Sequence, residues 1–176
     1  FYTDAAGASS CTACAGGSAT GQVHGATGCT VCSAGSFQGE TGQASCRSCF
    51  MGTFASSGGS LSCQRCAVGR YQDSTGAAAC FECATGHHQS SSGQPSCFAC
   101  AYGKFAASTG SSVCSSCGAG GYANALGSTA CVECPVGKAT AVTGQSTCSE
   151  CDAGKYSGAT GSLYCTKCVP GYHSLA

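Results

Sequence analysis

Every cysteine of this chain lies in a C-x-x-C pair, and the pairs recur at a nearly constant spacing. The first step between pairs is 18 residues long, and each of the other eight steps is 17 residues long. A fixed period of this kind predicts a repeat architecture in which neighbouring units stack on one another. The ten pairs are Cys11/Cys14, Cys29/Cys32, Cys46/Cys49, Cys63/Cys66, Cys80/Cys83, Cys97/Cys100, Cys114/Cys117, Cys131/Cys134, Cys148/Cys151 and Cys165/Cys168.

Glycines repeat in phase with the cysteines. A turn glycine follows each second cysteine by three residues, from Gly17 to Gly171, and a loop glycine follows it by ten residues, with Gly25 in the slipped first copy. These offsets predict two tight turns per repeat, a short extended piece between them and essentially no helix. Two residues beyond the turn glycine is a ring position, which we expect to supply one core ring per repeat. The rings are Phe37, Phe54, Tyr71, His88, Phe105, Tyr122 and Tyr156.

The composition requires crosslinks in place of an ordinary hydrophobic core. Leu, Ile, Val and Phe together make up only about 11% of the residues, whereas the chain has 20 Cys and 28 Gly. We therefore predict a small disulfide-rich fold, an elongated solenoid-like rod of ten 17-residue repeats with irregular structure and short β pieces. Residues 1–10 are interpreted as an N-terminal lead-in, and residues 11–176 as one continuous array whose last copy is incomplete.

The pattern C-x-x-C-x-x-G-x-[FY]-x(4)-G-x(3)-C resembles the ephrin-receptor-like cysteine-rich repeat, which is related to the modules of tumour necrosis factor receptors. The resemblance covers nearly the whole chain. Such repeats occur in receptor ectodomains, protist surface proteins and the flagellar hairs called mastigonemes, so the resemblance implies extracellular architecture and no particular activity.

Three uses of the cysteines are compatible with the spacing. The resemblance favours an offset pairing, in which each second cysteine bonds to the first cysteine of the next pair, because the similar receptor loop is closed in this way. This pairing leaves Cys11 and Cys168 for bonds between subunits. The offset bridges are Cys14–Cys29, Cys32–Cys46, Cys49–Cys63, Cys66–Cys80, Cys83–Cys97, Cys100–Cys114, Cys117–Cys131, Cys134–Cys148 and Cys151–Cys165.

The two other uses remain open at this point. A crossed pairing, such as Cys11 to Cys29 with Cys14 to Cys32, consumes all twenty cysteines. Four-cysteine zinc sites also fit the spacing and are the minor alternative to a chain without cofactors. Against zinc, the period does not distinguish odd from even pairs, and the basic residues of nucleic-acid-binding fingers are missing. Persistent disulfides indicate an oxidising compartment outside the cytosol.

Few side chains are candidates for chemistry. His88 occupies the ring position and His87 is its neighbour in the turn, so a structural use is expected for both. Glu82, Glu133 and Glu150 each precede a second cysteine, but one carboxylate per repeat does not form a calcium site. No paired carboxylates or phosphate-binding loop has structural support, and we expect neither a catalytic site nor an enzyme.

The surface composition narrows the set of partners. The formal net charge is zero, which predicts no nucleic-acid binding, and no apolar run approaches the roughly 20 residues of a membrane span. Ser and Thr number 27 and 16, and O-linked glycans on these side chains are a second interpretation beside ordinary turn chemistry.

Two functions are compatible with these observations. The favoured one is a structural, non-catalytic subunit of an extracellular filament, glycoprotein fibril or flagellar-hair-like appendage, formed by end-to-end or lateral self-assembly. Regular, uncapped repeats with a neutral surface favour such assembly. The alternative is a receptor or adhesion ectodomain stalk that binds a protein partner, for which loop insertions or a distinct contact patch would be expected.

Overall fold

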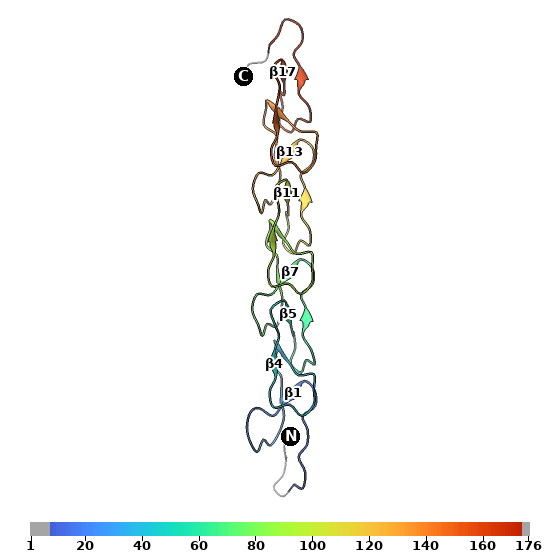
Figure 1. Ribbon diagram of the computed structural model, residues 1–176, viewed down its shortest axis with the longest axis vertical. Coiled ribbons are helices and arrows are strands. Elements are labelled where there is room, and N and C mark those ends of the chain that lie inside the picture. Colours follow the sequence, from blue (N-terminus) through green and yellow to red (C-terminus); the bar gives the residue numbers. More distant parts are fainter. Residues whose placement is uncertain (1–7, 174–176) are drawn as a thin grey trace. The chain divides into compact units, whose positions relative to one another are not determined.

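The computed structural model describes residues 8–173 and contains eighteen two-residue strands and no helix in that range (Figure 1). The chain forms two compact units. The first comprises residues 8–82 together with Ser91–Ser96, and the second comprises Cys83–Ser90 together with residues 97–173. Most of the predicted lead-in, residues 1–7 of 1–10, lies outside the described residues.

Each unit is a series of two-stranded antiparallel hairpins, and consecutive strands pair with one another. The strands of the first unit are β1 (Ser18–Ala19), β2 (Thr30–Val31), β3 (Ser36–Phe37), β4 (Arg47–Ser48), β5 (Thr53–Phe54), β6 (Gln64–Arg65), β7 (Arg70–Tyr71) and β8 (Phe81–Glu82). Those of the second unit are β9 (His87–His88), β10 (Phe98–Ala99), β11 (Lys104–Phe105), β12 (Ser115–Ser116), β13 (Gly121–Tyr122), β14 (Val132–Glu133), β15 (Lys138–Ala139), β16 (Ser149–Glu150), β17 (Lys155–Tyr156) and β18 (Thr166–Lys167).

The turn glycine starts every hairpin. Gly35 has a φ of 82°, and the next residue, Ser36, donates its N–H to the Ser33 carbonyl oxygen at 3.0 Å. Only the third residue of this four-residue turn has a positive φ, which is the pattern of a type II turn and the reason that glycine is required there. The loop glycines also have positive φ, so the prediction of two glycine turns per repeat is confirmed.

Successive repeats are joined by backbone hydrogen bonds at the same positions in each step. Gly35 donates its N–H to the Ala55 carbonyl oxygen at 2.8 Å, and Gln38 donates to the Ser60 carbonyl oxygen at 3.1 Å. In the opposite direction, loop glycines donate to second cysteines of the preceding repeat, as Gly76 does to Cys49 at 2.7 Å. The backbone N–H and C=O groups of each repeat therefore find hydrogen-bond partners in the neighbouring repeats. A 17-residue unit needs such partners because it is too small to form a core of its own.

Glycine also brings repeats two steps apart into direct contact. A Cβ atom on the turn glycine would overlap the backbone of a loop glycine two repeats further along the chain, so the turn position has no room for a side chain. The pairs in the first unit are Gly17/Gly59, Gly35/Gly76 and Gly52/Gly93, and those in the second are Gly86/Gly127, Gly103/Gly144 and Gly120/Gly161.

The core consists of sulfur and small or polar side chains, and the prediction that one ring per repeat forms it is wrong. The buried side chains are the second cysteines from Cys14 to Cys134, the two alanines at the ring position, Ala19 and Ala139, and an inner position six residues after the second cysteine, occupied by Gln38, Ala55, Gln72, Gln89, Ala106, Ala123, Thr140 and Ser157. The rings are only partly covered because each strand is two residues long, and the inner position directly after the ring takes the inward direction. Phe37, Phe54, Tyr71, His88, Phe105 and Tyr122 are half-buried, and Tyr156 is exposed.

A buried glutamine closes the loop in some repeats. Gln72 is 3% exposed, and its Nε2 donates to the Ala79 carbonyl oxygen at 2.7 Å while its Oε1 accepts from the Ser74 N–H at 3.0 Å. Gln38 makes the equivalent pair of bonds with Ser45 and Glu40. Both polar atoms of the side-chain amide therefore have a hydrogen-bond partner, as burial of a polar group requires.

Candidate functional site

Nine disulfide bonds run through the two units, and they form the disulfide ladder. All nine are offset bridges, which join a second cysteine to the first cysteine of the next pair, with Cα–Cα distances of 5.6 or 5.7 Å. The first unit contains Cys14–Cys29, Cys32–Cys46, Cys49–Cys63 and Cys66–Cys80. The second contains Cys83–Cys97, Cys100–Cys114, Cys117–Cys131, Cys134–Cys148 and Cys151–Cys165.

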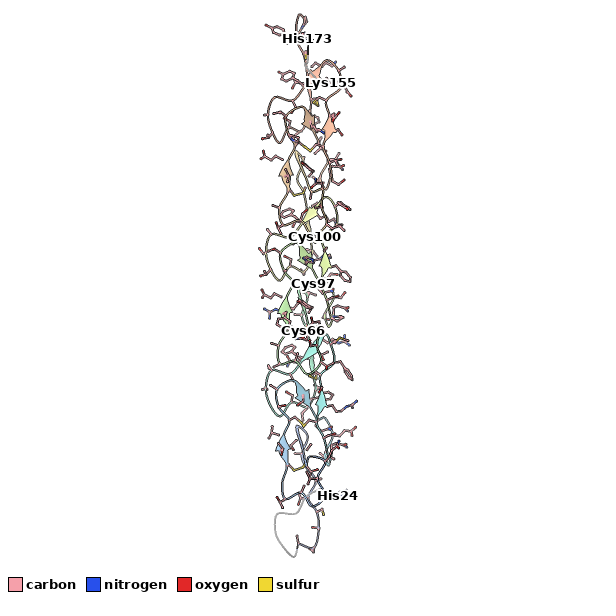
Figure 2. All side chains as sticks on the ribbon, turned by 90° about the vertical axis from the view of Figure 1, so that its left-hand side faces the viewer. His24, Cys66, Cys97, Cys100, Lys155 and His173 are labelled. Carbon is pink, nitrogen blue, oxygen red and sulfur yellow. A yellow bond between two sulfur atoms is a disulfide. The ribbon has the colours of Figure 1, made fainter. Side chains whose placement is uncertain are left out.

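Each bridge closes one glycine turn and one hairpin. Cys32 directly precedes the turn that leads into β3, and Cys46 directly precedes β4, so the disulfide links the two ends of the segment that contains the β3–β4 hairpin. The second cysteine donates its N–H back to the turn glycine, as Cys49 does to Gly35 at 2.9 Å. Figure 2 shows bridges of this kind at Cys66, Cys97 and Cys100. The covalent closure compensates for strands too short to pair stably alone.

Two cysteines of the described residues, Cys11 and Cys168, are not in a disulfide. Cys11 is exposed and Cys168 is half-buried. They are opposite members of their pairs: Cys11 is a first cysteine and Cys168 is a second cysteine. The offset pairing joins a second cysteine to a first cysteine, so it would pair a cysteine such as Cys168 with one such as Cys11.

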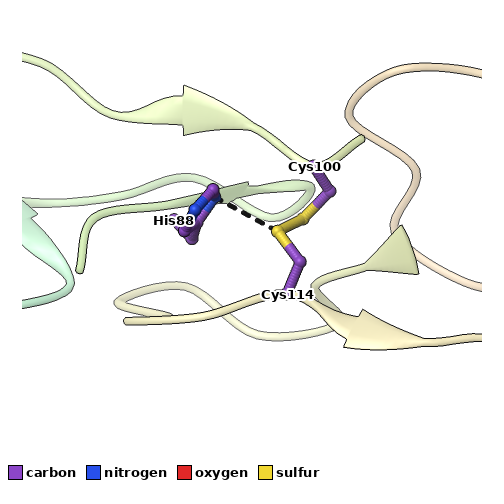
Figure 3. Close-up of side chains that lie close together, drawn as sticks. All are labelled: His88, Cys100 and Cys114. Atoms are coloured by element: carbon purple, nitrogen blue, oxygen red, sulfur yellow. Dashed lines mark hydrogen bonds between the residues drawn. A yellow bond between two sulfur atoms is a disulfide. The ribbon is translucent and has the colours of Figure 1, made fainter. Parts of the chain in front are cut away.

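His88, Cys100 and Cys114 form the one group of three potential metal ligands within residues 8–173, with ligand atoms less than 4.8 Å apart (Figure 3). His88 Nδ1 lies 3.2 Å from Cys114 Sγ and 3.2 Å from the Phe98 carbonyl oxygen. Both sulfurs belong to one disulfide, which leaves no thiolate for a metal ion. The arrangement places a planar ring against a bridge, which is the structural use expected of His88.

Ring positions contact the opposite strand of their own hairpin. The Tyr71 and Phe81 rings are 5.9 Å apart between centroids, and the His88 and Phe98 rings are 6.4 Å apart. The Arg47 guanidinium lies 5.8 Å from the centroid of the Phe37 ring. Such cross-strand pairs stabilise a short hairpin by several tenths of a kcal/mol to about 1 kcal/mol each.

The glutamates beside the second cysteines contact cations or hydroxyl groups. Glu82 is bonded to Arg70 at 2.7 Å, Glu150 to Lys138 at 3.0 Å, and Glu133 accepts a hydrogen bond from Thr160 at 2.7 Å. These contacts do not bring two carboxylates together. The glutamates therefore act as exposed partners of individual cations or hydroxyls.

One carboxyl group has a shifted pKa. Lys155 Nζ hydrogen-bonds to Asp152 Oδ2 at 2.6 Å, and this bond with the lysine charge lowers the pKa of Asp152 below its usual value of 3.8. The Asp152 carboxylate is exposed to solvent, so the pair changes a local titration rather than the stability of the fold.

Within residues 8–173, helices of membrane-spanning length and hydrophobicity are absent.

Comparison with protein families identifies the repeats. Residues 40–79 and 103–146 match the family described as tyrosine-protein kinase ephrin type A/B receptor-like. These two segments are thus ephrin-receptor-like cysteine-rich repeats, which are disulfide-rich domains of an extracellular type. No curated protein matches the chain.

Proposed function

We propose that this chain is a structural, non-catalytic subunit of an extracellular filament, glycoprotein fibril or flagellar-hair-like appendage, built by self-assembly. The observation that carries the proposal is the recurrence of the same backbone bonds at each step within a unit. Every repeat has one surface that binds the repeat before it and one that binds the repeat after it. When these two surfaces lie on different chains, the chains can polymerise.

The two free thiols support covalent assembly. Cys11 and Cys168 are the members of their pairs that the offset pairing assigns to a neighbouring repeat. Disulfides between subunits at these positions would continue the disulfide ladder from chain to chain. Such disulfides would make the filament resistant to dilution and denaturation, which backbone contacts alone would not do.

Absence of catalysis is part of the proposal. Eighteen of the twenty cysteines are disulfide-bonded and cannot act as thiolate nucleophiles. The ion pairs join exposed groups at the surface of individual hairpins. Such groups lack the buried, converging arrangement that acid–base catalysis uses.

Exposed hydroxyl groups are the proposed positions of O-linked glycans. Both residues of β12, Ser115 and Ser116, are exposed, as are Ser48 of β4, Ser149 of β16 and Thr166 of β18. A glycan at these positions would extend into solvent without displacing a core side chain. Loss of hexose-sized masses after alkaline β-elimination of native material is the expected result.

The assembly proposal is tested by the mass of native material denatured without reduction and again after reduction. A series of covalent multiples of the chain that collapses to the monomer on reduction is the expected result. A single monomeric mass, together with a monomeric sedimentation coefficient under native conditions, would overturn the proposal. The receptor or adhesion ectodomain stalk would then be the better account, and its protein partner would be sought.

A further inference from the structure

The imidazole of His88 lies against the disulfide Cys100–Cys114 in the second unit (Figure 3). Its Nδ1 atom is 3.2 Å from Cys114 Sγ, and the ligand atoms of the three residues lie within 4.8 Å of one another. Nδ1 also lies 3.2 Å from the carbonyl oxygen of Phe98, in the opposite strand of the hairpin. Two contacts at one ring nitrogen therefore hold the imidazole beside the sulfur atoms.

The following repeat of this unit has a different kind of ring at the same position. His88 precedes Cys114 by 26 residues, and Phe105 precedes Cys131 by the same interval. A phenyl ring neither donates a hydrogen bond to sulfur nor ligates a metal ion. The histidine thus gives its bridge a chemistry that the bridge beside Phe105 lacks.

The three side chains of the group differ in exposure. Cys100 is completely buried, whereas His88 and Cys114 are half-buried. Solvent and small molecules therefore reach the bridge from the side of Cys114. This is the side from which a thiol attacks the disulfide and from which a metal ion enters.

We propose that reduction of Cys100–Cys114 converts these three side chains into a zinc site, in which both thiolates and the His88 imidazole bind the ion. Zinc prefers thiolate and imidazole ligands, and three protein ligands leave a fourth position for water. The site goes beyond the proposed function, because it involves neither self-assembly nor the cysteines assigned to bonds between subunits.

The distances fit a tetrahedral ion after a small movement of the sulfurs. Zinc–sulfur bonds of about 2.3 Å and zinc–nitrogen bonds of about 2.1 Å place sulfur and nitrogen about 3.6 Å apart and two sulfurs about 3.8 Å apart. The distance from His88 Nδ1 to Cys114 Sγ is already 3.2 Å. The Cα atoms of Cys100 and Cys114 are 5.7 Å apart, so rotation of the two side chains separates the sulfurs once their bond is broken.

Opening the bridge requires a reductant, and a dithiol is sufficient. One thiolate of the dithiol attacks Cys114 Sγ, the disulfide bond breaks, and its electron pair leaves with Cys100 Sγ as a thiolate. The second thiolate of the dithiol then attacks the sulfur of the first, which releases Cys114 as a thiolate and oxidises the dithiol to a cyclic disulfide. The two cysteines gain two electrons, the protons of the dithiol pass to solvent, and zinc binds to the two thiolates.

Hydrogen bonding favours reduction of this bridge over the next one. With its proton on Nδ1, the His88 ring donates to the thiolate released at Cys114, and a hydrogen bond to a charged acceptor is stronger than one to a neutral sulfur. When zinc binds at Nδ1, the ring proton moves to Nε2, which gives the other tautomer of the neutral imidazole. Zinc then increases the preference for the reduced state by mass action.

The first measurement is the reduction of the full chain in anaerobic mixtures of reduced and oxidised dithiothreitol. Thiols are trapped by alkylation and located by peptide mapping. Cys100 and Cys114 should be alkylated at least about tenfold more than Cys117 and Cys131 when little reduced dithiothreitol is present. His88→Phe should abolish this preference. Equal reduction of the two bridges in the unsubstituted chain, or the same preference in His88→Phe, would overturn the proposal.

The second measurement is metal binding after the dithiothreitol has been removed by gel filtration. Cobalt(II) is added as a probe that absorbs light when thiolates ligate it, and zinc is used to displace it. One displaceable ion per chain is expected, and His88→Phe should lower the affinity for zinc at least about tenfold. His87→Phe is the matched control and should leave the affinity unchanged, because His87 Nδ1 contacts the Thr85 carbonyl oxygen at 3.2 Å.

Phe105→His tests the role of histidine by adding it at the equivalent position. This substitution should make Cys117–Cys131 as easily reduced as Cys100–Cys114 and should add a second zinc ion. A single ion in Phe105→His would overturn the role assigned to histidine. Lack of thiolate-to-cobalt absorption in a chain with Cys100 and Cys114 reduced, or equal zinc affinity in His88→Phe, would overturn the site. Self-assembly is measured without reductant, so failure of the zinc site leaves the proposed function standing.

Discussion

The backbone of Gly35 lies directly against that of Gly76, so closely that a Cβ atom on Gly35 would overlap the Gly76 carbonyl oxygen. Two repeat steps separate these glycines. Glycine is required at the turn because the backbone there has a positive φ and the contact leaves no volume for a side chain, and glycine recurs at the loop because that backbone also has a positive φ. Backbone packing therefore takes a role that apolar side chains have in most folds.

Gly35→Ala is expected to destabilise its hairpin more than Gly137→Ala. Both positions have the same left-handed backbone, with φ of 82° and 81°, which costs about 1–2 kcal/mol for alanine. Gly35→Ala adds an overlap that costs about 1–3 kcal/mol more. Hydrogen exchange of the Cys49 amide in the first variant and of the Cys151 amide in the second reads the local effect, because each donates to the substituted residue. Equal losses at the two sites would contradict the role of glycine contact.

Gln72→Leu should destabilise the loop between β7 and β8. The substitution introduces an apolar side chain of similar size and leaves the Ser74 N–H and the Ala79 carbonyl without their buried partner, at a cost of about 1–3 kcal/mol. Limited proteolysis should cut within residues 73–79 about tenfold faster or more. Gln64→Leu, at an exposed position of β6, is the control and should leave the rate unchanged. An unchanged rate in Gln72→Leu would show that the amide bonds do not hold the loop.

Removal of one bridge should open one loop. Replacement of Cys66 and Cys80 by alanine deletes a crosslink across 14 residues of sequence, for which loop entropy gives about 3 kcal/mol. We expect new cleavage within residues 67–79, with the bridge Cys32–Cys46 still intact by peptide mapping. Cys11→Ser is the control, since Cys11 is exposed and unbonded, and it should leave the cleavage pattern unchanged. Global unfolding of the double variant would mean that the bridges act cooperatively.

The Asp152–Lys155 pair should produce a local pH dependence. Because the lysine lowers the pKa of Asp152, the interaction is fully present above the ordinary aspartate value of 3.8 and is lost as the pH falls through the lowered pKa. In Lys155→Met the pKa of Asp152 should return towards 3.8. A carboxyl-carbon NMR titration measures both values. An identical titration in the two proteins would show that the pair does not form in solution.

The sequence predicts the repeat length, the turns and the absence of helix because cysteine and glycine are the residues that set them. The position of Gly35 and its counterparts can be recognised in the sequence, because only glycine can adopt a positive φ there while its backbone contacts that of another residue. The spacing alone left three uses of the cysteines open, and the resemblance to receptor repeats, rather than geometry, favoured the offset one.

The core could not be predicted in the same way. Tyr71 is the conspicuous residue of its hairpin, yet Gln72 beside it is the buried one. The inner position accepts Gln, Ala, Thr or Ser, so no single residue type marks it in the sequence. Its burial follows from the direction of side chains after a two-residue strand and, for Gln, Thr and Ser, from side-chain hydrogen bonds to the backbone, neither of which is visible in a hydrophobic period.

The offset pairing of the disulfide ladder is the central claim, and peptide mapping of the monomer without reduction tests it most directly. The chain is denatured, alkylated and digested with a non-specific protease. We predict alkylation of two cysteines per chain, Cys11 and Cys168, and linked peptides that join Cys100 to Cys114 and Cys117 to Cys131. Peptides that join Cys80 to Cys97 and Cys83 to Cys100, with no cysteine alkylated, would contradict the account in favour of crossed pairing, and alkylation of all twenty cysteines would contradict disulfides altogether.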